Sequence, residues 1–151
     1  MIKPVQTLFV AIALSVASLA PVLAQTPTVS QTIDTMLGDH TKYQAMIAAL
    51  QAGVKNKDAA GVAALVSYPI VVKIHGKKTA IKTAADFTRN YDAIITPAVA
   101  AVIEGQKYET LFVNAQGIMF GNGEVWINGI CKDTACSKSD AKVITIQNGP
   151  N

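Results

Sequence analysis

Residues 117–130 read GIMFGNGEVWINGI and carry the clearest structural pattern of the chain. The runs Gly117 to Phe120 and Glu124 to Ile130 are both typical of strands. Between them, Asn122-Gly123 is a dipeptide that favours a tight turn joining two antiparallel strands. A further strand, Ala141 to Gln147, returns after this hairpin. The last third of the chain is therefore predicted to form an antiparallel sheet.

The strand beginning at Glu124 has two chemically different faces, because side chains alternate along a strand. Glu124, Trp126 and Asn128 share one face, and Val125 and Ile127 share the other. If the Val125 face meets the helices, Trp126 is open to solvent or to a partner. If Trp126 instead points inward, Glu124 follows it into a cavity, where it would be a candidate acid.

Two cysteines, Cys131 and Cys136, lie in the connection between the last two strands. An even number of cysteines in an exported protein predicts a disulfide. A loop of this length can bring the two Cα atoms together across a hairpin. A redox-active pair is the alternative, but catalytic dithiols favour C-x-x-C before a helix. We therefore interpret the pair as structural.

The chain before residue 111 has the apolar spacing of helices. The spacing of Tyr43, Met46, Ile47, Leu50 and Val54 places one apolar stripe on a helix over residues 41–55. Three shorter helices are predicted at 30–37, at 59–66 with Asp58 as N-cap, and from Pro97 to Gly105. Another helix is predicted from Thr83, and its apolar face consists of Phe87, Tyr91, Ile94 and Ile95. Residues 69–75 and 78–81 are predicted strands, and the pattern leaves Leu111 to Asn114 undecided.

Helices followed by an antiparallel sheet predict an α+β domain. The order of elements resembles the nuclear-transport-factor-2-like superfamily, also called SnoaL-like or cystatin-like. The matching features are KDAAGVAAL at 57–65, the hairpin 70–81, the helix 87–95 and the run 117–127, so the resemblance covers residues 41–147. It implies a cone, in which N-terminal helices pack on a curved sheet around an apolar pocket. Members include isomerases, cyclases, dehydratases and non-catalytic binding modules, and related modules dimerise through the sheet face.

The first 24 residues have the pattern of a secretory signal peptide. Lys3 is followed by an apolar run, Leu8 to Leu19, and by Val22-Leu23-Ala24 at the cleavage site. A run of about 12 residues is too short for a bilayer that needs roughly 20. We expect residues 25–40 to be a polar leader and residues 41–151 to be one domain. The mature protein is expected to be periplasmic or secreted, without a stable membrane anchor.

Charge and motifs exclude several functions. The chain has 13 basic and 10 acidic residues, a net charge of +3, and no polybasic stripe, so nucleic acid is not an expected partner. His40 and His75 lie in different elements without a neighbouring group of acidic residues or cysteines in the sequence pattern, so no metal site is predicted. Phosphate-loop, flavin and nicotinamide motifs are absent, and no cofactor is expected.

The resemblance implies that an enzyme of this fold would place a carboxylate base and a tyrosine or second acid in its pocket. Tyr91 and Asp92 form the nearest such pair, but adjacent helical residues are about 100° apart. Asp92 is therefore expected at the solvent edge of its helix, and Tyr91 in the core. Asn114 could line the pocket or shape a turn, and Glu124 and Trp126 complete the candidate pocket residues.

Three functions remain open. The favoured one is an exported, non-catalytic binding protein that takes a small apolar ligand in its pocket or a protein on its sheet face. The first alternative is an isomerase or dehydratase that uses Asp92 or Glu124 as base. The second is an inhibitor or immunity protein that blocks an envelope hydrolase with the loop between Cys131 and Cys136. Assembly of the chain into a homodimer is a further expectation.

Overall fold

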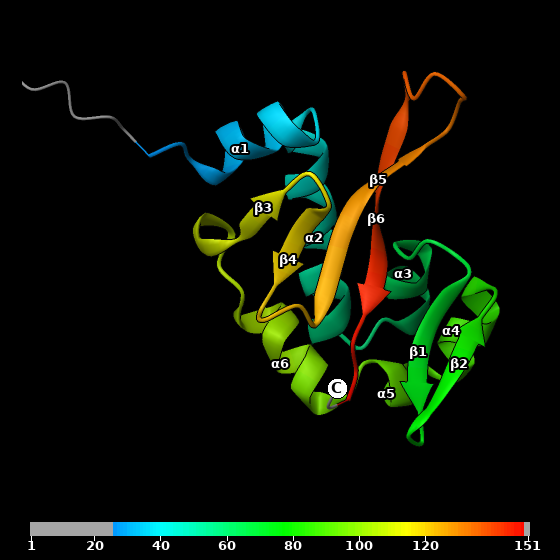
Figure 1. The fold of residues 1–151 in the computed structure, drawn as a ribbon. Helices are drawn as coiled ribbons and strands as arrows, with labels where there is room; N and C mark the ends of the chain where they lie inside the picture. The colour runs from blue at the N-terminus through cyan, green and yellow to red at the C-terminus, as the bar shows by residue number, and fades with distance from the viewer. Residues whose placement is uncertain (1–25, 150–151) are drawn as a thin grey trace, which may run out of the picture.

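The computed structural model describes residues 26–149, and the predicted signal peptide at 1–24 lies outside this range (Figure 1). The domain is α+β, as predicted. Its helices are α1 Val29–Met36, α2 His40–Lys55, α3 Ala59–Ala64, α4 Ala84–Arg89, α5 Tyr91–Ile94 and α6 Pro97–Gly105, with a short 3₁₀ turn, η1, at Tyr108–Thr110. Its strands are β1 Ile70–Ile74, β2 Lys77–Ile81, β3 Phe112–Asn114, β4 Gly117–Phe120, β5 Val125–Cys131 and β6 Ser139–Ile146.

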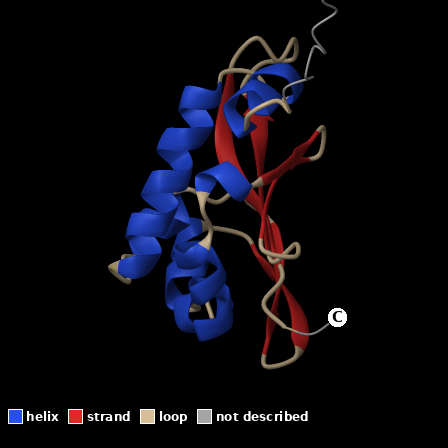
Figure 2. Cartoon of the chain, turned by 90° about the vertical axis from the view of Figure 1, so that its left-hand side faces the viewer, coloured by secondary structure: helices blue, strands red, loops and turns tan. Residues whose placement is uncertain are grey.

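Helices and strands form two layers, with the long helix α2 and the lower helices on one side of the strands (Figure 2). The main sheet is antiparallel in the order β3-β4-β5-β6, and β1 and β2 form a separate hairpin. The expected sheet is thus divided in two. A parallel bridge between Val66 and Val143 connects the segment before β1 to β6. The side chain of Asn148 strengthens the connection, because it donates to the Lys73 carbonyl (2.6 Å) and accepts from the Lys73 N–H (2.8 Å).

The apolar stripe of α2 is the helical part of the core, as its spacing predicted. All five predicted residues are buried: Tyr43, Met46, Ile47, Leu50 and Val54. They pack in one cluster with the inward face of the sheet, where Ile118, Phe120, Val125 and Ile127 have no exposed surface. The apolar face of the helix layer is buried against the apolar face of the sheet, and this contact fixes how the two layers stack.

Helix α1, within the predicted leader 25–40, contacts the rest of the described fold. Ile33 is completely buried, and α1 contacts β3. Thr28 caps the helix by accepting from the Gln31 N–H, and the Gln31 side chain accepts from the Thr28 N–H in return. The brief helix predicted at 30–37 is confirmed as α1, and its apolar residues Val29, Ile33 and Leu37 recur at a helical spacing.

The helix predicted from Thr83 begins there but divides at Asn90 into α4 and α5. Asn90 donates its side-chain amide to the carbonyl of Asp86 (2.9 Å) and leaves the helical backbone region. Asparagine competes with the helix backbone in this way. The predicted apolar face is nevertheless confirmed, because Phe87, Tyr91, Ile94 and Ile95 are all buried.

The predicted hairpin at 117–130 is confirmed with a longer turn. Phe120 pairs with Val125, so residues 121–124 form the connection around Asn122-Gly123. Gly121 and Gly123 have φ values of 59° and 111°, which glycine adopts without the strain of a Cβ atom. The undecided segment after Leu111 forms β3, and the predicted last strand begins earlier, at Ser139.

Candidate functional site

The structure decides between the two orientations of β5. Val125 and Ile127 are completely buried against the helices, whereas Trp126 is half-buried on the other face. The first alternative from the sequence is therefore confirmed: the Trp126 face of the strand points away from the helix layer.

An apolar row crosses this outer face of the sheet. Phe112 pairs with Met119, Met119 with Trp126, and Trp126 with Thr145. Residues directly opposite each other on neighbouring strands lie on the same face, so these four side chains form one line. Phe112, at one end of the line, is 51% exposed. We call Phe112, Met119 and Trp126 the aromatic row.

Glu124 and Asn114 serve turns next to this face. The Glu124 carboxylate turns back to accept the N–H of Asn122 within its own loop. It also lines a groove of about 430 Å³ together with Val102 of α6. Asn114 accepts the N–H of Gln116 (2.8 Å), which is the turn role that the sequence left open.

Tyr91 and Asp92 point to different surroundings. Tyr91 is 8% exposed and its ring meets Phe87 edge-on at 6.3 Å. Its hydroxyl is buried and has no hydrogen-bond partner among the described residues. Asp92 is exposed, as expected. Because Tyr91 lies within the helix layer and Trp126 on the outer face of the sheet, the five candidate pocket residues are not brought together.

Burial raises the pKa of three of the four tyrosines, Tyr43, Tyr68 and Tyr91. For Tyr68, whose hydroxyl donates to the Ala63 carbonyl, the pKa rises from 10.0 to about 12. A raised pKa favours the neutral form, so this stabilisation is complete below pH 10.0 and is lost as the pH rises toward 12.

We expect tyrosinate absorbance to develop largely together with unfolding in this window, as followed by absorbance and circular dichroism. Ionisation of all four tyrosines before any loss of structure would contradict the burial.

The structure brings Asp34 and the sequence neighbour Asp39 together beside His40, where no metal site was predicted. Its Nδ1 lies 2.8 Å from the Asp34 carboxylate, and Asp39 adds a third potential ligand. The hydrogen bond from the His40 N–H is the main cause that lowers the pKa of Asp34, followed by the bond to the ring. Asp39 is itself the N-cap of α2, accepting the N–H of Thr41. The trio could hold a cation, but its contacts already secure the corner between α1 and α2.

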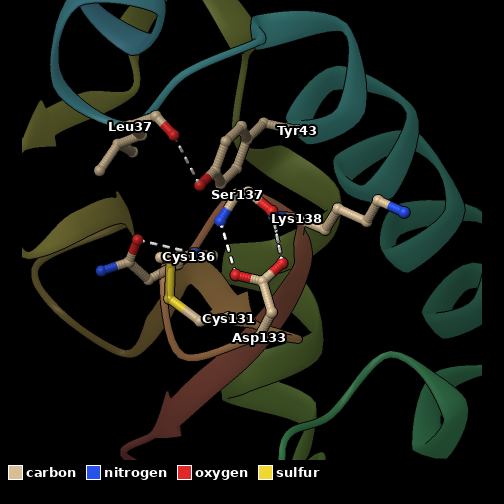
Figure 3. Close-up of a disulfide and its surroundings, with 9 residues drawn as sticks. Leu37, Tyr43, Cys131, Asp133, Cys136, Ser137 and Lys138 are labelled. Carbon is tan, nitrogen blue, oxygen red and sulfur yellow. Dashed lines mark hydrogen bonds between the residues drawn. A yellow bond between two sulfur atoms is a disulfide. The ribbon is translucent and has the colours of Figure 1, made fainter.

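Cys131 and Cys136 form the predicted disulfide at the end of the β5–β6 hairpin (Figure 3). Their Cα atoms are 4.8 Å apart. Inside the loop, the Asp133 carboxylate accepts from the Ser137 N–H (2.8 Å) and the Lys138 N–H (3.1 Å). The Ser137 hydroxyl also donates to Asp133 (2.6 Å), and this bond is the largest cause that lowers the pKa of the carboxyl, followed by the Ser137 N–H. The loop is therefore a closed, internally bonded unit.

We expect the double variant Cys131→Ser/Cys136→Ser to lower the free energy of unfolding by about 2 kcal/mol. The value is small because the disulfide closes a short loop, so it restricts the unfolded chain little. Urea denaturation of this variant and of the reduced wild type should give the same result. A loss above about 4 kcal/mol, more than the roughly 3 kcal/mol of a 15-residue loop, would mean that the hairpin end supports the core.

No described helix, within residues 26–149, has the length and apolar character needed to cross a membrane. The disulfide is compatible with an extracellular or periplasmic protein. Comparison of the chain with protein-family models, curated proteins and solved structures gave no match. The resemblance to the nuclear-transport-factor-2-like superfamily consequently stays a prediction that rests on the order of elements.

Proposed function

We propose that this chain is an exported, non-catalytic binding protein of the nuclear-transport-factor-2-like type, and that it binds another protein through the outer face of its main sheet. The observation that carries the proposal is the aromatic row, which ends at a phenylalanine that is 51% exposed. Export to the periplasm or beyond is supported by the pattern of residues 1–24 and by the disulfide.

The outer face has the composition of a protein interface. Aromatic residues and methionine are enriched in such interfaces, and tryptophan near the centre often contributes most of the binding energy. Trp126 lies between Met119 and Thr145 in the row, with Ile130 (40% exposed) further along β5. These apolar side chains lie on the face opposite Val125 and Ile127, which are completely buried.

A catalytic function has less support. The acid–base mechanism requires a carboxylate base and a hydrogen-bond donor that line the same cavity, because both must reach one bound substrate. Here the Glu124 carboxylate is held by its own turn, and Asp92 is exposed on α5. The unpartnered hydroxyl of Tyr91 lies in the core, away from the outer face.

The test is native mass spectrometry of the mature protein purified gently from its own envelope, comparing wild type with Phe112→Ser. We expect a stoichiometric protein partner with the wild type and its loss with Phe112→Ser. Val71→Ser is the matched control, because Val71 is 59% exposed but lies on β1, in the other sheet. This control should keep the partner.

Two other results would replace the proposal. A small co-purifying mass that survives Phe112→Ser and disappears on denaturation would move the function to a ligand site. A homodimer without another protein, dissociated by Phe112→Ser, would make the aromatic row a contact between copies of the chain.

A further inference from the structure

A second surface of the molecule is the free edge of β6. Val143 donates its N–H to the Leu65 carbonyl and accepts the N–H of Ser67, each at 2.9 Å. Both backbone groups of Val143 therefore point away from β5. The direction alternates along an antiparallel strand, so Ala141 and Ser139 also point their N–H and C=O groups away from β5.

The β5–β6 pairing supports this assignment from the opposite side. Lys132 donates its N–H to the Lys138 carbonyl at 2.8 Å, which shows that position 138 bonds toward β5. The bulge between Trp126 and Ile127 lies beyond this part of the ladder. The segment 65–67 pairs with β6 at Val143, whereas β3, at the other edge of the main sheet, lies against α1.

A groove of about 530 Å³ follows the same part of β6. Its floor includes Met46 of α2 and Leu65, which supply apolar surface. Its charged residues are four lysines, Lys42, Lys132, Lys138 and Lys142, and one acid, Asp140. We call this surface the basic edge groove.

The charges in the groove do not cancel. Lys132 forms an ion pair with Asp140 at 2.8 Å, and that contact is the main cause that lowers the pKa of Asp140. Lys142 and Lys42 lower this pKa further, so three lysines act on one carboxylate. Lys142 also donates to the Ala64 carbonyl at the end of α3, which places its charge beside the groove.

We propose that the basic edge groove binds an extended acidic peptide segment of a partner, which adds as a strand to β6. Such a strand would continue the pairing that residues 65–67 already make with Val143. Its backbone would bond to Ala141 and Ser139, as in other sheets extended by a peptide. Alternate side chains would contact Met46 and Leu65, and acidic side chains between them would meet the lysines.

Lysines on an edge strand also guard against pairing between copies of the same sheet. This guarding role does not conflict with the proposal, because the repulsion depends on the partner's charge. A second basic edge is repelled, whereas an acidic strand is attracted, so the same residues select the occupant. A surface that only guards would not bind an acidic strand.

The probe is a fluorescein-labelled peptide, Thr-Glu-Val-Glu-Val-Glu-Val-Glu-Thr, titrated with the oxidised protein in fluorescence anisotropy at low salt. Two control peptides have lysine in place of glutamate, or N-methyl groups on alternate residues. We expect binding of the acidic peptide only, because the first control reverses the charge and the second removes backbone donors. Equal binding of the N-methylated peptide would overturn strand addition.

Variants test the location. Lys42→Gln/Lys138→Gln should weaken binding by about tenfold, since each exposed charge contributes modestly. It leaves Lys132 with Asp140 and Lys142 with Ala64. The matched control Lys55→Gln/Lys82→Gln removes two exposed lysines elsewhere and should change affinity less than about twofold. Equal weakening by both pairs would reduce the effect to net charge and overturn the site.

Amide resonances give a readout independent of charge. Hydrogen exchange of the Ala141 and Ser139 amides, followed by NMR, should slow when the acidic peptide is added. Protection at β2 or β3 instead would overturn the assignment to β6. Absence of peptide binding, with self-association of Lys42→Gln/Lys138→Gln, would show that the lysines only guard the edge. This proposal is separate from the aromatic row, and Phe112→Ser should leave peptide binding unchanged.

Discussion

Replacing Phe87 by alanine is expected to lower the free energy of unfolding by about 3–5 kcal/mol. The side chain has no exposed surface. Its ring lies between Tyr68 and Tyr91, with both ring centroids 6.3 Å away and both contacts edge-on. Such pairs add about 0.5–1.5 kcal/mol each beyond the buried area.

The loss is large because helix α4 has few other core residues. Phe87 is the buried residue of α4, and its ring contacts Tyr68, in the segment that leads into β1. Native domains are stable by only about 5–15 kcal/mol, so the variant should be close to unfolding at physiological temperature.

Urea denaturation followed by circular dichroism measures the effect, with Phe112→Ala as the matched control. This control removes the same atoms from a side chain that is 51% exposed, so it should change stability by less than about 0.5 kcal/mol. A loss below about 1.5 kcal/mol for Phe87→Ala would mean that the neighbouring rings close the cavity, and that the aromatic cluster is not a fixed part of the core.

Gly117→Ala is expected to cost about 3 kcal/mol or more. Gly117 has a φ of 133°, in a region that essentially only glycine occupies. A Cβ atom there would lie 2.3 Å from the Ile127 carbonyl oxygen, which is part of the paired strand β5. The clash is with backbone, so β4 and β5 would have to separate to relieve it.

Gly105→Ala is the control for the loss of a glycine. Gly105 ends α6 with no atom within 4 Å of the added Cβ. Alanine there should leave stability unchanged or raise it by up to about 1 kcal/mol, because it reduces the freedom of the unfolded chain. Thermal unfolding of the two variants compares them directly. Equal midpoints would show that β4 adapts to a side chain at position 117.

The sequence predicted the structure correctly where the local pattern of residues agrees with which side chains are buried in the fold. The stripe of α2, the cap of α3 at Asp58 and the hairpin around Asn122-Gly123 follow from spacing and local hydrogen bonding. The disulfide follows from the two cysteines and the strands around them. Helix α1 was predicted as a brief helix at 30–37, but the burial of Ile33 depends on packing that includes distant β3, which a local pattern does not show.

The candidate site shows the same division. The period of two on β5 established that Trp126 and Val125 lie on opposite faces, but both orientations satisfied the alternation. Packing against α2 selected the inward face. The sequence also grouped Tyr91, Asp92, Asn114, Glu124 and Trp126 by a resemblance in chain order, which carries no distances. The structure places Tyr91 and Trp126 on different sides of the main sheet.

Backbone periodicity, caps and turns depend on residues a few positions apart, so the amino-acid sequence was sufficient to predict most local elements and the α+β class. Which surfaces remain available depends instead on tertiary packing. The aromatic row requires the register of three strands, and the basic edge groove joins Lys42 of α2 to Lys138 and Lys142 near the chain's end. Contacts so distant in sequence depend on how whole layers pack, and packing is set by the sum of many buried surfaces.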